Sequence, residues 1–321
     1  MQQHNDAMPR QFQRACVTGG AGFIGSRLVR RLLERGLSVT VLDNLSTGRR
    51  ENLPAGAKLV EGDLLSLENG MEALEGCDLV FHLAARVAIR SSFEFVVEDT
   101  LSNVVGTASI LRSAVRLGTI KRVISASSMG VYADSPAPIP IDESYPVVPT
   151  SPYGISKVAL EQLTHQMAAS GGFESIVLRL FNTYGPGQRY SPYVGVITIF
   201  INKLSAGESP TIFGDGQQAR DFVHVDDVVN GFLGAMDCAH PGETINIGTG
   251  VSHTVEQVYR VVARSLSCDL EPLFSPPVRG ELRYAIAAID KARRLLGYRP
   301  EKVFEESLEE VVSEVVSQRP T

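Results

Sequence analysis

The stretch Thr18-Gly19-Gly20-Ala21-Gly22-Phe23-Ile24-Gly25 decides the fold of this 321-residue chain. Residues 14–18 before it are predicted to form a short buried strand, and residues 26–35 after it place leucine and valine at helical spacing. The glycines satisfy both G-x-x-G-x-x-G and G-x-G-x-x-G, the strand-to-helix turn at which the backbone approaches a dinucleotide pyrophosphate. An ordinary tight turn is the alternative. The predicted contacts with such a cofactor are Gly19, Gly22, Phe23, Ile24 and Gly25.

An acidic residue, Asp43, closes the second predicted strand at residues 38–43. A carboxylate there can bind the ribose hydroxyls of adenosine and repels a 2′-phosphate, so NAD is favoured over NADP. Arg49 and Arg50 argue in the other direction, and a strand-end cap is the alternative role for Asp43. Asp63 follows a third strand and is a candidate for the adenine edge, with an ordinary loop carboxylate as the alternative.

Strand and helix signals alternate through the N-terminal half of the chain. Further strands are predicted at residues 58–61, 79–83, 122–127 and 175–180, with helices between them, notably at 100–117 and 153–170. This alternation predicts an α/β fold, with a Rossmann-type, doubly wound parallel sheet covered by helices on both faces.

After Asn182 the rhythm changes, beginning with a loop at residues 184–193 that is rich in glycine, proline and aromatic residues. Shorter elements follow, with helices expected at 194–205, 255–267, 291–296 and 304–316 and strands at 211–213, 222–225 and 244–247. They predict a smaller C-terminal α/β substrate domain that is interleaved with the first. The expected division is a cofactor-binding domain at 14–181 together with 223–250, and a second domain at 182–222 and 251–321.

Composition narrows the class of function. A net charge of −6 argues against nucleic acid as a partner, so any phosphate site must be built locally. The four cysteines are scattered without C-x-x-C or metal-ligand spacing, which favours free thiols in a reducing cytoplasm and no metal site. No apolar run is long enough to cross a membrane. The polar residues 1–13 lack the apolar core of a secretory signal and are predicted to be a disordered extension.

Tyr153 and Lys157 lie four residues apart, which on a helix places both side chains on one face about one turn apart. A phenol is a poor base at neutral pH because its unperturbed pKa is about 10. A neighbouring ammonium favours the phenolate and lowers that pKa. Such a pair can exchange a proton with a substrate hydroxyl. The pair alone is a weak signal, since many helices carry one by chance.

Further motifs, taken in order with these, resemble the extended short-chain dehydrogenase/reductase family, and within it the nucleotide-sugar epimerases and dehydratases. The likeness spans nearly the whole chain, from Ala15 to about Pro300. It is specific for the family and less specific for the substrate. It rests on the glycine motif, Asp43-Asn-Leu-Ser-Thr-Gly48, His82-Leu-Ala-Ala85, Ser127-Ser-Met-Gly-Val-Tyr132, Ser151-Pro-Tyr-Gly-Ile-Ser-Lys157, Arg179-Leu-Phe-Asn-Thr-Tyr-Gly-Pro186, Phe213-Gly-Asp-Gly216 and Arg220-Asp-Phe-Val-His-Val-Asp-Asp227.

The resemblance implies NAD as the cofactor and a catalytic group of Ser128, Tyr153 and Lys157. Ser128 is expected to hydrogen-bond the reacting oxygen of the sugar, Tyr153 to exchange its proton, and Lys157 to bind the nicotinamide ribose and lower the pKa of Tyr153. A strand-end hydroxyl is the alternative role for Ser128. The other cofactor contacts implied are Asn44, Ser46, Thr47, Gly48, Leu64, Leu83, Ala84, Ala85 and Asn103, the last of which could instead bond only to backbone; His82 is expected to be structural.

The resemblance also implies a UDP-sugar substrate, held by the C-terminal half. Arg220 is expected at the diphosphate, where a guanidinium fork suits phosphate oxygens, with an Arg220–Asp221 surface pair as the alternative. A second family arginine is matched one place late, in Val278-Arg279-Gly280-Glu281, with Arg283 in reserve. The implied substrate contacts are Ser128, Asn182, Val196, Ile197, Thr211, Phe213, Arg220, Arg279 and Glu281.

Two residues separate the reactions of the family. Relatives that remove water across C5–C6 usually carry an Asp-Glu pair after the catalytic serine, and UDP-glucuronate decarboxylases usually carry Glu. This chain has Met129 and Gly130, which cannot transfer protons. The expected reaction is therefore 4-epimerisation of a UDP-hexose through a transient 4-keto sugar, with the glucose/galactose, N-acetyl and uronic acid forms left open.

Other interpretations of the sequence remain. A dehydrogenase or ketoreductase would use the same residues but change the cofactor's oxidation state at every turnover, and a decarboxylase is a further alternative. A non-catalytic dinucleotide sensor is the rival from another class. The resemblance, rather than any pattern in the sequence, implies a homodimer formed through the predicted helices at residues 100–117 and 153–170.

Overall fold

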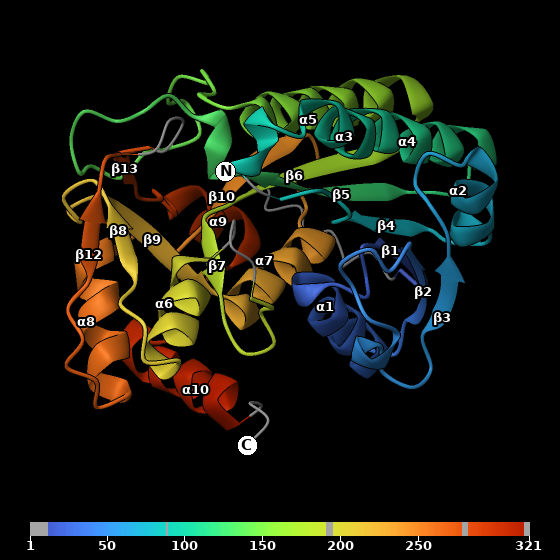
Figure 1. Cartoon of the computed structure of the whole chain (residues 1–321). Helices are drawn as coiled ribbons and strands as arrows, with labels where there is room; N and C mark the ends of the chain where they lie inside the picture. Colours follow the sequence, from blue (N-terminus) through green and yellow to red (C-terminus); the bar gives the residue numbers. More distant parts are fainter. Residues whose placement is uncertain (1–11, 88, 191–194, 278–281, 318–321) are drawn as a thin grey trace.

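The computed structural model describes residues 12–87, 89–190, 195–277 and 282–317. Its largest element is a seven-stranded, wholly parallel sheet with the order β10-β6-β5-β4-β1-β2-β3 (Figure 1). Because β1 lies between β2 and β4, the strand order reverses at β1, which is where this fold class binds ligands. The strands are β1 (Arg14–Thr18), β2 (Ser38–Asp43), β3 (Lys58–Glu61), β4 (Leu79–His82), β5 (Arg122–Ser128), β6 (Glu174–Leu180) and β10 (Glu243–Ile247).

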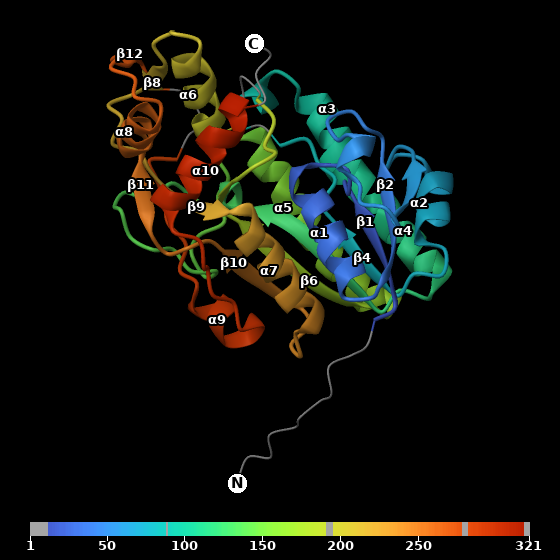
Figure 2. The ribbon, with the colours of Figure 1, turned by 90° about the horizontal axis from the view of Figure 1, so that it is seen from below.

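Helices cover both faces of this sheet (Figures 1 and 2). Side chains of a strand alternate between faces, so Ala15 and Val17 join one buried cluster while Cys16 joins another. Helices α1 (Phe23–Glu34) and α7 (Val225–Asp237) pack on the first face. The opposite face is covered by α2 (Leu67–Leu74), α4 (Gly106–Leu117) and α5 (Pro152–Gly171). The predicted doubly wound α/β fold is confirmed.

A second, smaller unit is built mainly from the later chain. Strand β9 (Ala219–His224) pairs with β7 (Asn182–Tyr184), β11 (Ser252–Thr254) and β13 (Tyr284–Ala285), while β8 (Thr211–Phe213) pairs with β12 (Leu273–Ser275). Helices α6 (Val196–Ser205), α8 (Val255–Ser265) and α10 (Phe304–Ser317) enclose a core of their own. The two units are interleaved along the chain, because α7 and β10 from its later part pack with the large sheet, with α9 (Asp290–Leu296) beside them.

The region predicted as one helix at residues 100–117 is more complex. It comprises α3 (Val96–Thr100), a π-helical turn (Leu101–Val105) and then α4. π-Turns of this kind frequently occur at functional sites. The remaining short helices are 3₁₀ turns at Arg50–Asn52, Ser91–Phe93 and Met129–Val131. Within the described part of the chain, no helix is both long and apolar enough to cross a membrane.

Candidate active site

The turn between β1 and α1 leaves no room for a side chain at Gly19 or Gly25. Gly19 has a φ of 70°, and a Cβ at Gly25 would lie 2.2 Å from the carbonyl oxygen of Gly19. Helix α1 then begins at Phe23 with no side-chain cap and no acidic residue in its first turn. The N–H groups of an uncapped first turn attract anions. This turn therefore fits the pyrophosphate of a dinucleotide.

Asp43 fulfils the cap role proposed for it as an alternative. Its Oδ2 accepts a hydrogen bond from the Ala21 N–H at 2.9 Å, and its Oδ1 accepts one from the Leu45 N–H at 2.9 Å. An ionised carboxylate has about four acceptor positions, so these bonds leave capacity for ribose hydroxyls. Asp63 is exposed and accepts from the Asn44 side chain at 3.1 Å, which links the two predicted adenosine loops.

Ser128, Tyr153 and Lys157 are brought together where β5 ends and α5 begins. Ser128 is the last residue of β5, and Tyr153 lies in the first turn of α5, which is capped by the Ser151 side chain and starts at Pro152. The Lys157 Nζ donates to the Ala126 carbonyl at 2.9 Å. All three predicted catalytic side chains are buried. The spacing in the sequence thus corresponds to one compact group in space.

The pKa of Tyr153 differs from the sequence-based expectation. Burial raises it to about 12, although a hydrogen bond from Ser128 lowers it and Asp99 adds a further increase. The Lys157 Nζ lies 5.8 Å from the centre of the Tyr153 ring, and burial lowers the pKa of this ammonium to about 8. In the protein chain alone, desolvation of the phenolate therefore outweighs the effect expected from the neighbouring lysine.

His82 is structural, as expected. Its ring nitrogens contact the hydroxyls of Thr18 and Thr107, each at 2.8 Å, and burial lowers the pKa of the ring to about 3. Thr18 also accepts from the Ala84 N–H at 3.2 Å. These bonds hold the backbone of the predicted cofactor segment at residues 83–85 against the glycine turn, where a Cβ at Gly19 would lie 2.8 Å from the Ala84 nitrogen.

Asn103, on the π-turn, bonds mainly to backbone. Its Oδ1 accepts from the Arg86 N–H at 2.8 Å, and its Nδ2 donates to the Arg86 carbonyl and to the Ser156 hydroxyl, both at 3.0 Å. The amide is completely buried. This geometry matches the alternative considered for Asn103, in which it acts by fixing the segment after β4.

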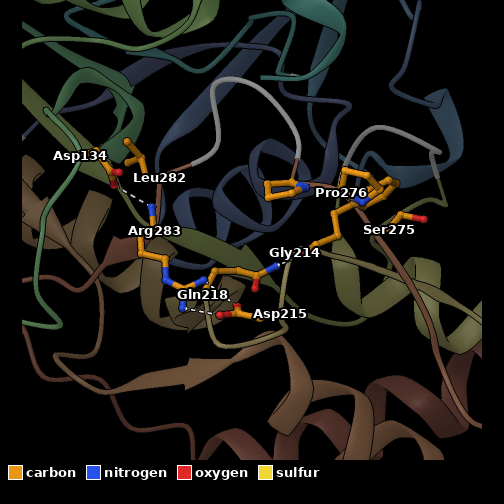
Figure 3. A pocket seen from close by; sticks show the side chains of 10 residues that line it. Asp134, Gly214, Asp215, Gln218, Ser275, Pro276, Leu282 and Arg283 are labelled. Atoms are coloured by element: carbon orange, nitrogen blue, oxygen red, sulfur yellow. Dashed lines mark hydrogen bonds and ion pairs between the residues drawn. The ribbon is translucent and has the colours of Figure 1, made fainter.

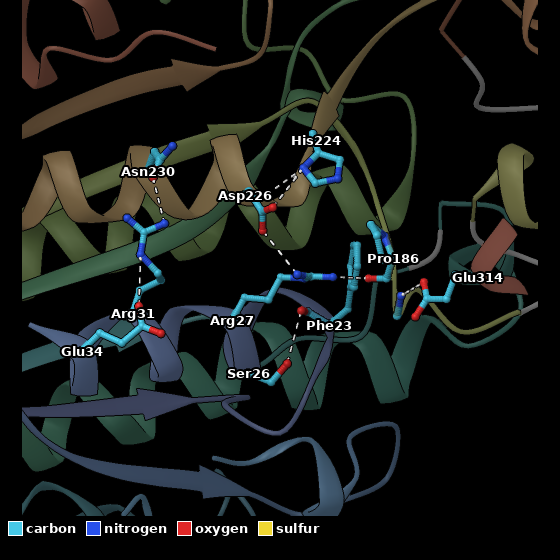
Figure 4. A network of polar contacts seen from close by, with 11 residues as sticks. Phe23, Ser26, Arg27, Arg31, Glu34, Pro186, His224, Asp226, Asn230 and Glu314 are labelled. Carbon is cyan, nitrogen blue, oxygen red and sulfur yellow. Dashed lines mark hydrogen bonds and ion pairs between the residues drawn. The ribbon is translucent and has the colours of Figure 1, made fainter. Parts of the chain in front are cut away.

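A segment at residues 185–189 joins the smaller unit to the cofactor side (Figure 4). The Arg27 side chain, on α1, donates to the Pro186 carbonyl at 2.6 Å and pairs with Asp226 at 3.3 Å. The Gly187 N–H donates to Glu314 at 2.9 Å. Arg189 donates to the carbonyl of Thr47 at 3.1 Å, in the predicted ribose loop. The segment is thus bonded to α1, α10 and the loop after β2.

A cavity of about 490 Å³ lies in the smaller unit (Figure 3). Phe213 from β8 lines it, and the Arg90 guanidinium lies 4.7 Å from the centre of the Phe213 ring. Arg283 lines the same cavity and forms a two-pronged pair with Asp215 at 2.7 and 2.8 Å. This pairing occupies the fork that Arg283 would need for a diphosphate. The lining residues are Asp134, Phe213, Gly214, Asp215, Gln218, Ser275, Pro276, Pro277, Leu282 and Arg283.

The other predicted substrate residues are placed unevenly. Asn182 opens β7 and is half-buried, and Thr211 is half-buried on β8. Val196 is half-buried at the start of α6, but the Ile197 side chain is packed in the second core, so only its backbone can face a ligand. Arg220 is buried, not on the surface, and donates to the carbonyls of Ala219 and Arg283. Arg279 and Glu281 lie outside the described residues.

Comparison with known proteins gives the family. The model of the NAD dependent epimerase/dehydratase family matches residues 15–248. The chain belongs to this family. The UDP-glucose 4-epimerase of Mycolicibacterium smegmatis is 37% identical over 305 residues, covering 93% of this chain and 97% of the relative.

Other members of the epimerase/dehydratase family show how far the likeness reaches. The structure of a UDP-glucose 4-epimerase from Thermotoga maritima with UDP-glucose superposes with a TM-score of 0.90 at 36% identity, covering 95% of this chain and 99% of the other. A UDP-N-acetyl-alpha-D-glucosaminuronate decarboxylase of Bacillus cytotoxicus is 35% identical over 77% of this chain and 78% of its own length. Similarity at this level therefore includes more than one reaction.

The structure adds Gln218 to the residues that the sequence indicated for a ligand. Its Nε2 donates to the Phe213 carbonyl at 2.8 Å, which fixes the amide orientation because that carbonyl can only accept. Within the described part of the chain, no group donates to the Oε1, which is buried. An unsatisfied buried acceptor is unfavourable unless a ligand donates to it. Gln218 lies between two motifs of the family resemblance, Phe213–Gly216 and Arg220–Asp227, and this position is the signal in the sequence that could have indicated it.

We expect the nucleotide to donate a hydrogen bond to Oε1, so Gln218→Leu should weaken binding of UDP by roughly tenfold. Isothermal titration calorimetry with UDP measures the change. Gln217→Leu is the matched control, since the neighbouring side chain is exposed and donates to Glu256 instead. Equal affinity in the wild type and in Gln218→Leu would show that the nucleotide does not use this acceptor.

Proposed function

We propose that this chain is an NAD-dependent 4-epimerase of a UDP-hexose. The observation that carries the proposal is the buried group of Ser128, Tyr153 and Lys157, in which the two residues after Ser128 are Met129 and Gly130 and carry no acid. UDP-glucose is the substrate named for the relative from Mycolicibacterium smegmatis. For this chain the glucose, N-acetylglucosamine and glucuronate series remain the candidate substrates.

The residues next to Ser128 support epimerisation over the other reactions of the family. The Met129 side chain is buried in the main core. Gly130 faces the site, since a Cβ there would lie 3.5 Å from the Ser128 hydroxyl and 3.7 Å from the Tyr153 ring. An acid or base at position 130 would therefore be well placed for a second proton transfer, but glycine supplies none. Dehydration and decarboxylation are disfavoured on this ground.

In the proposed mechanism the chain moves one proton at O4 of the sugar. NAD⁺, when bound, supplies the hydride acceptor and a positive charge that favours the phenolate. Tyr153 accepts the O4 proton and later returns it, while the Ser128 hydroxyl donates a hydrogen bond to the same oxygen. Lys157 holds positive charge near the phenolate. Exclusion of water by the buried site protects the 4-keto sugar while it turns over.

An assay of the purified protein without added NAD tests this function. UDP-glucose, UDP-N-acetylglucosamine and UDP-glucuronate are incubated separately, and the products are resolved by NMR. Inversion at C4 with no net change in NADH absorbance is the expected result. NADH formed in proportion to product would indicate the dehydrogenase alternative, and loss of carbon dioxide would indicate a decarboxylase. Bound NAD without turnover of any UDP-hexose would favour the sensor.

We also propose that the protein is a cytoplasmic homodimer. An exposed apolar stripe follows one face of α3 and the π-turn through Val97, Leu101 and Val105, and α5, which packs against both, adds Ile155. Val97 and Ile155 are 63% and 59% exposed. A contiguous apolar face of this kind marks an interaction surface.

The proposed cytoplasmic location rests on the cysteines. All four are free thiols, which suits a reducing compartment.

The double variant Val97→Asp with Val105→Asp is expected to be a monomer, because two carboxylates would have to be desolvated at the interface. Size-exclusion chromatography with light scattering measures the mass. Val303→Asp, at a valine 52% exposed in the smaller unit, should leave the dimer intact. A monomeric wild type, or a double variant that stays dimeric, would contradict the assignment of this surface.

A further inference from the structure

A buried ion pair lies next to the catalytic group, one turn of α5 after Lys157. Arg179, on β6, donates from Nε and Nη2 to the two carboxylate oxygens of Glu161, on α5, at 2.8 and 2.7 Å. Both side chains are less than a tenth exposed. Burying two charges costs much of what their attraction returns, so such a pair is weak evidence for a purely stabilising role. Its position invites a different explanation.

Glu161 and Lys157 together fasten α5 to the end of β5. Lys157 donates to the carbonyl of Ala126, and one helical turn later Glu161 accepts from the hydroxyl of Ser127. Ser128 is the next residue of the strand. Two successive turns of the helix are thus bonded to two successive residues of the strand that presents Ser128. A substitution at Glu161 is therefore expected to affect the positions of both Ser128 and Lys157.

Glu161 is also the main counter-charge to Lys157. It favours the ammonium, opposing the burial that lowers the pKa of Lys157. His82 on β4 also interacts with Lys157, but its low pKa leaves it neutral. The negative charge of Asp99, on α3, raises the pKa of Tyr153. Arg179 on β6 pairs with Glu161 and so offsets part of its charge.

We propose that Glu161 is a positioning residue for the reaction, which keeps Lys157 charged and fixes the end of β5 that carries Ser128. The positive charge of Arg179 partly cancels the effect of the Glu161 carboxylate on Lys157. The proton affinity of Lys157 therefore depends on both charges. This inference rests on the proposed roles of Tyr153 and Lys157. It predicts that removing either member of the pair shifts the proton affinity of Lys157, in opposite directions.

The experiment compares four variants of the NAD-loaded protein by the pH dependence of kcat. Glu161→Gln removes the negative charge and should move the alkaline limb down by about one pH unit, as expected for a nearby opposite charge. Arg179→Gln leaves Glu161 unopposed and should move it up. The double variant should return it close to the wild-type position. Ser127→Ala keeps every charge and should leave the limb in place.

A second measurement needs no substrate. NMR of lysine labelled with ¹³C at Cε follows the titration of Lys157 directly, with Lys157→Met used to assign the signal. The same opposite shifts are expected. If the wild type turns over no UDP-hexose, the proposed function fails, yet this titration still tests the role of Glu161.

The structural alternative gives a different result. If the pair only stabilises the fold, the variants lose thermal stability while the limb and the Lys157 titration stay at wild-type values, and the proposal is overturned. If Glu161→Gln does not fold, Arg179→Gln and the double variant still differ only in the charge at position 161. Identical titrations in those two would equally overturn it.

Discussion

Replacing Tyr153 by phenylalanine is expected to lower kcat for UDP-hexose epimerisation by about a thousandfold, the range typical of losing a general acid–base. The substitution removes one oxygen. The ring stays in a buried position, packed beside Gly130 and Ser128, so the fold and the bound NAD should be retained. Epimerisation is followed by NMR, and the cofactor is measured in the protein after denaturation.

Tyr145→Phe is the control for this experiment. The Tyr145 hydroxyl donates only a long hydrogen bond, 3.4 Å, to the Asp134 carbonyl, and no catalytic role is proposed for it. Its kcat should remain within about twofold of the wild-type value, as for most substitutions that spare an active site. A Tyr153→Phe protein that keeps more than a tenth of the wild-type kcat would remove Tyr153 from the mechanism.

Gly25→Ala is expected to cost the protein its cofactor and about 3 kcal/mol of stability, the upper part of the range for forcing an extra methyl into a packed site. The new Cβ would lie 2.2 Å from the Gly19 carbonyl oxygen and 2.8 Å from the Gly20 Cα. Both are backbone atoms, so α1 must move away from the turn that its N-terminus is expected to complete. Urea unfolding and the NAD content measure the two losses.

Gly22→Ala provides a graded comparison within the same turn. Its Cβ would lie 3.2 Å from the Gly19 oxygen, and its φ of −81° is open to any residue. A shift of a few tenths of an ångström relieves that contact, so this variant should lose much less stability than Gly25→Ala. Gly25→Ala protein that purifies with a full complement of NAD would contradict the proposed role of the turn.

Local patterns in the sequence predicted much of the large sheet and the helical pairing of Tyr153 with Lys157. Strands β1, β2 and β3 have the predicted bounds, because their apolar runs end at glycine or acidic residues. Tyr153 and Lys157 could be placed on one face of a helix from their spacing, whereas Ser128 was joined to them only by the family resemblance. The family resemblance then supplied the roles that spacing alone leaves open.

Features that depend on distant contacts were not predicted. The ion pair between Glu161 and Arg179 joins a helix to a strand, and the spacing of residues along the sequence does not predict it. The pKa of Tyr153 was expected to fall because only Lys157 was considered, whereas its burial is a property of the folded site. Ile197 has the apolar character of a contact residue, but its neighbours in space place its side chain in the core.

The bonds made by residues 185–189 have a consequence for how the protein would work in a cell. Arg27 and Arg189 hold this segment to the helix and the loop that are expected to bind the two ends of the cofactor's adenosine diphosphate. Release of NAD would then require several of these bonds to break, so exchange with the free pool should be slow compared with turnover. The bound NAD would then not equilibrate with free NAD⁺ and NADH during turnover. The rate of sugar interconversion would therefore be the same in oxidising and reducing metabolic states.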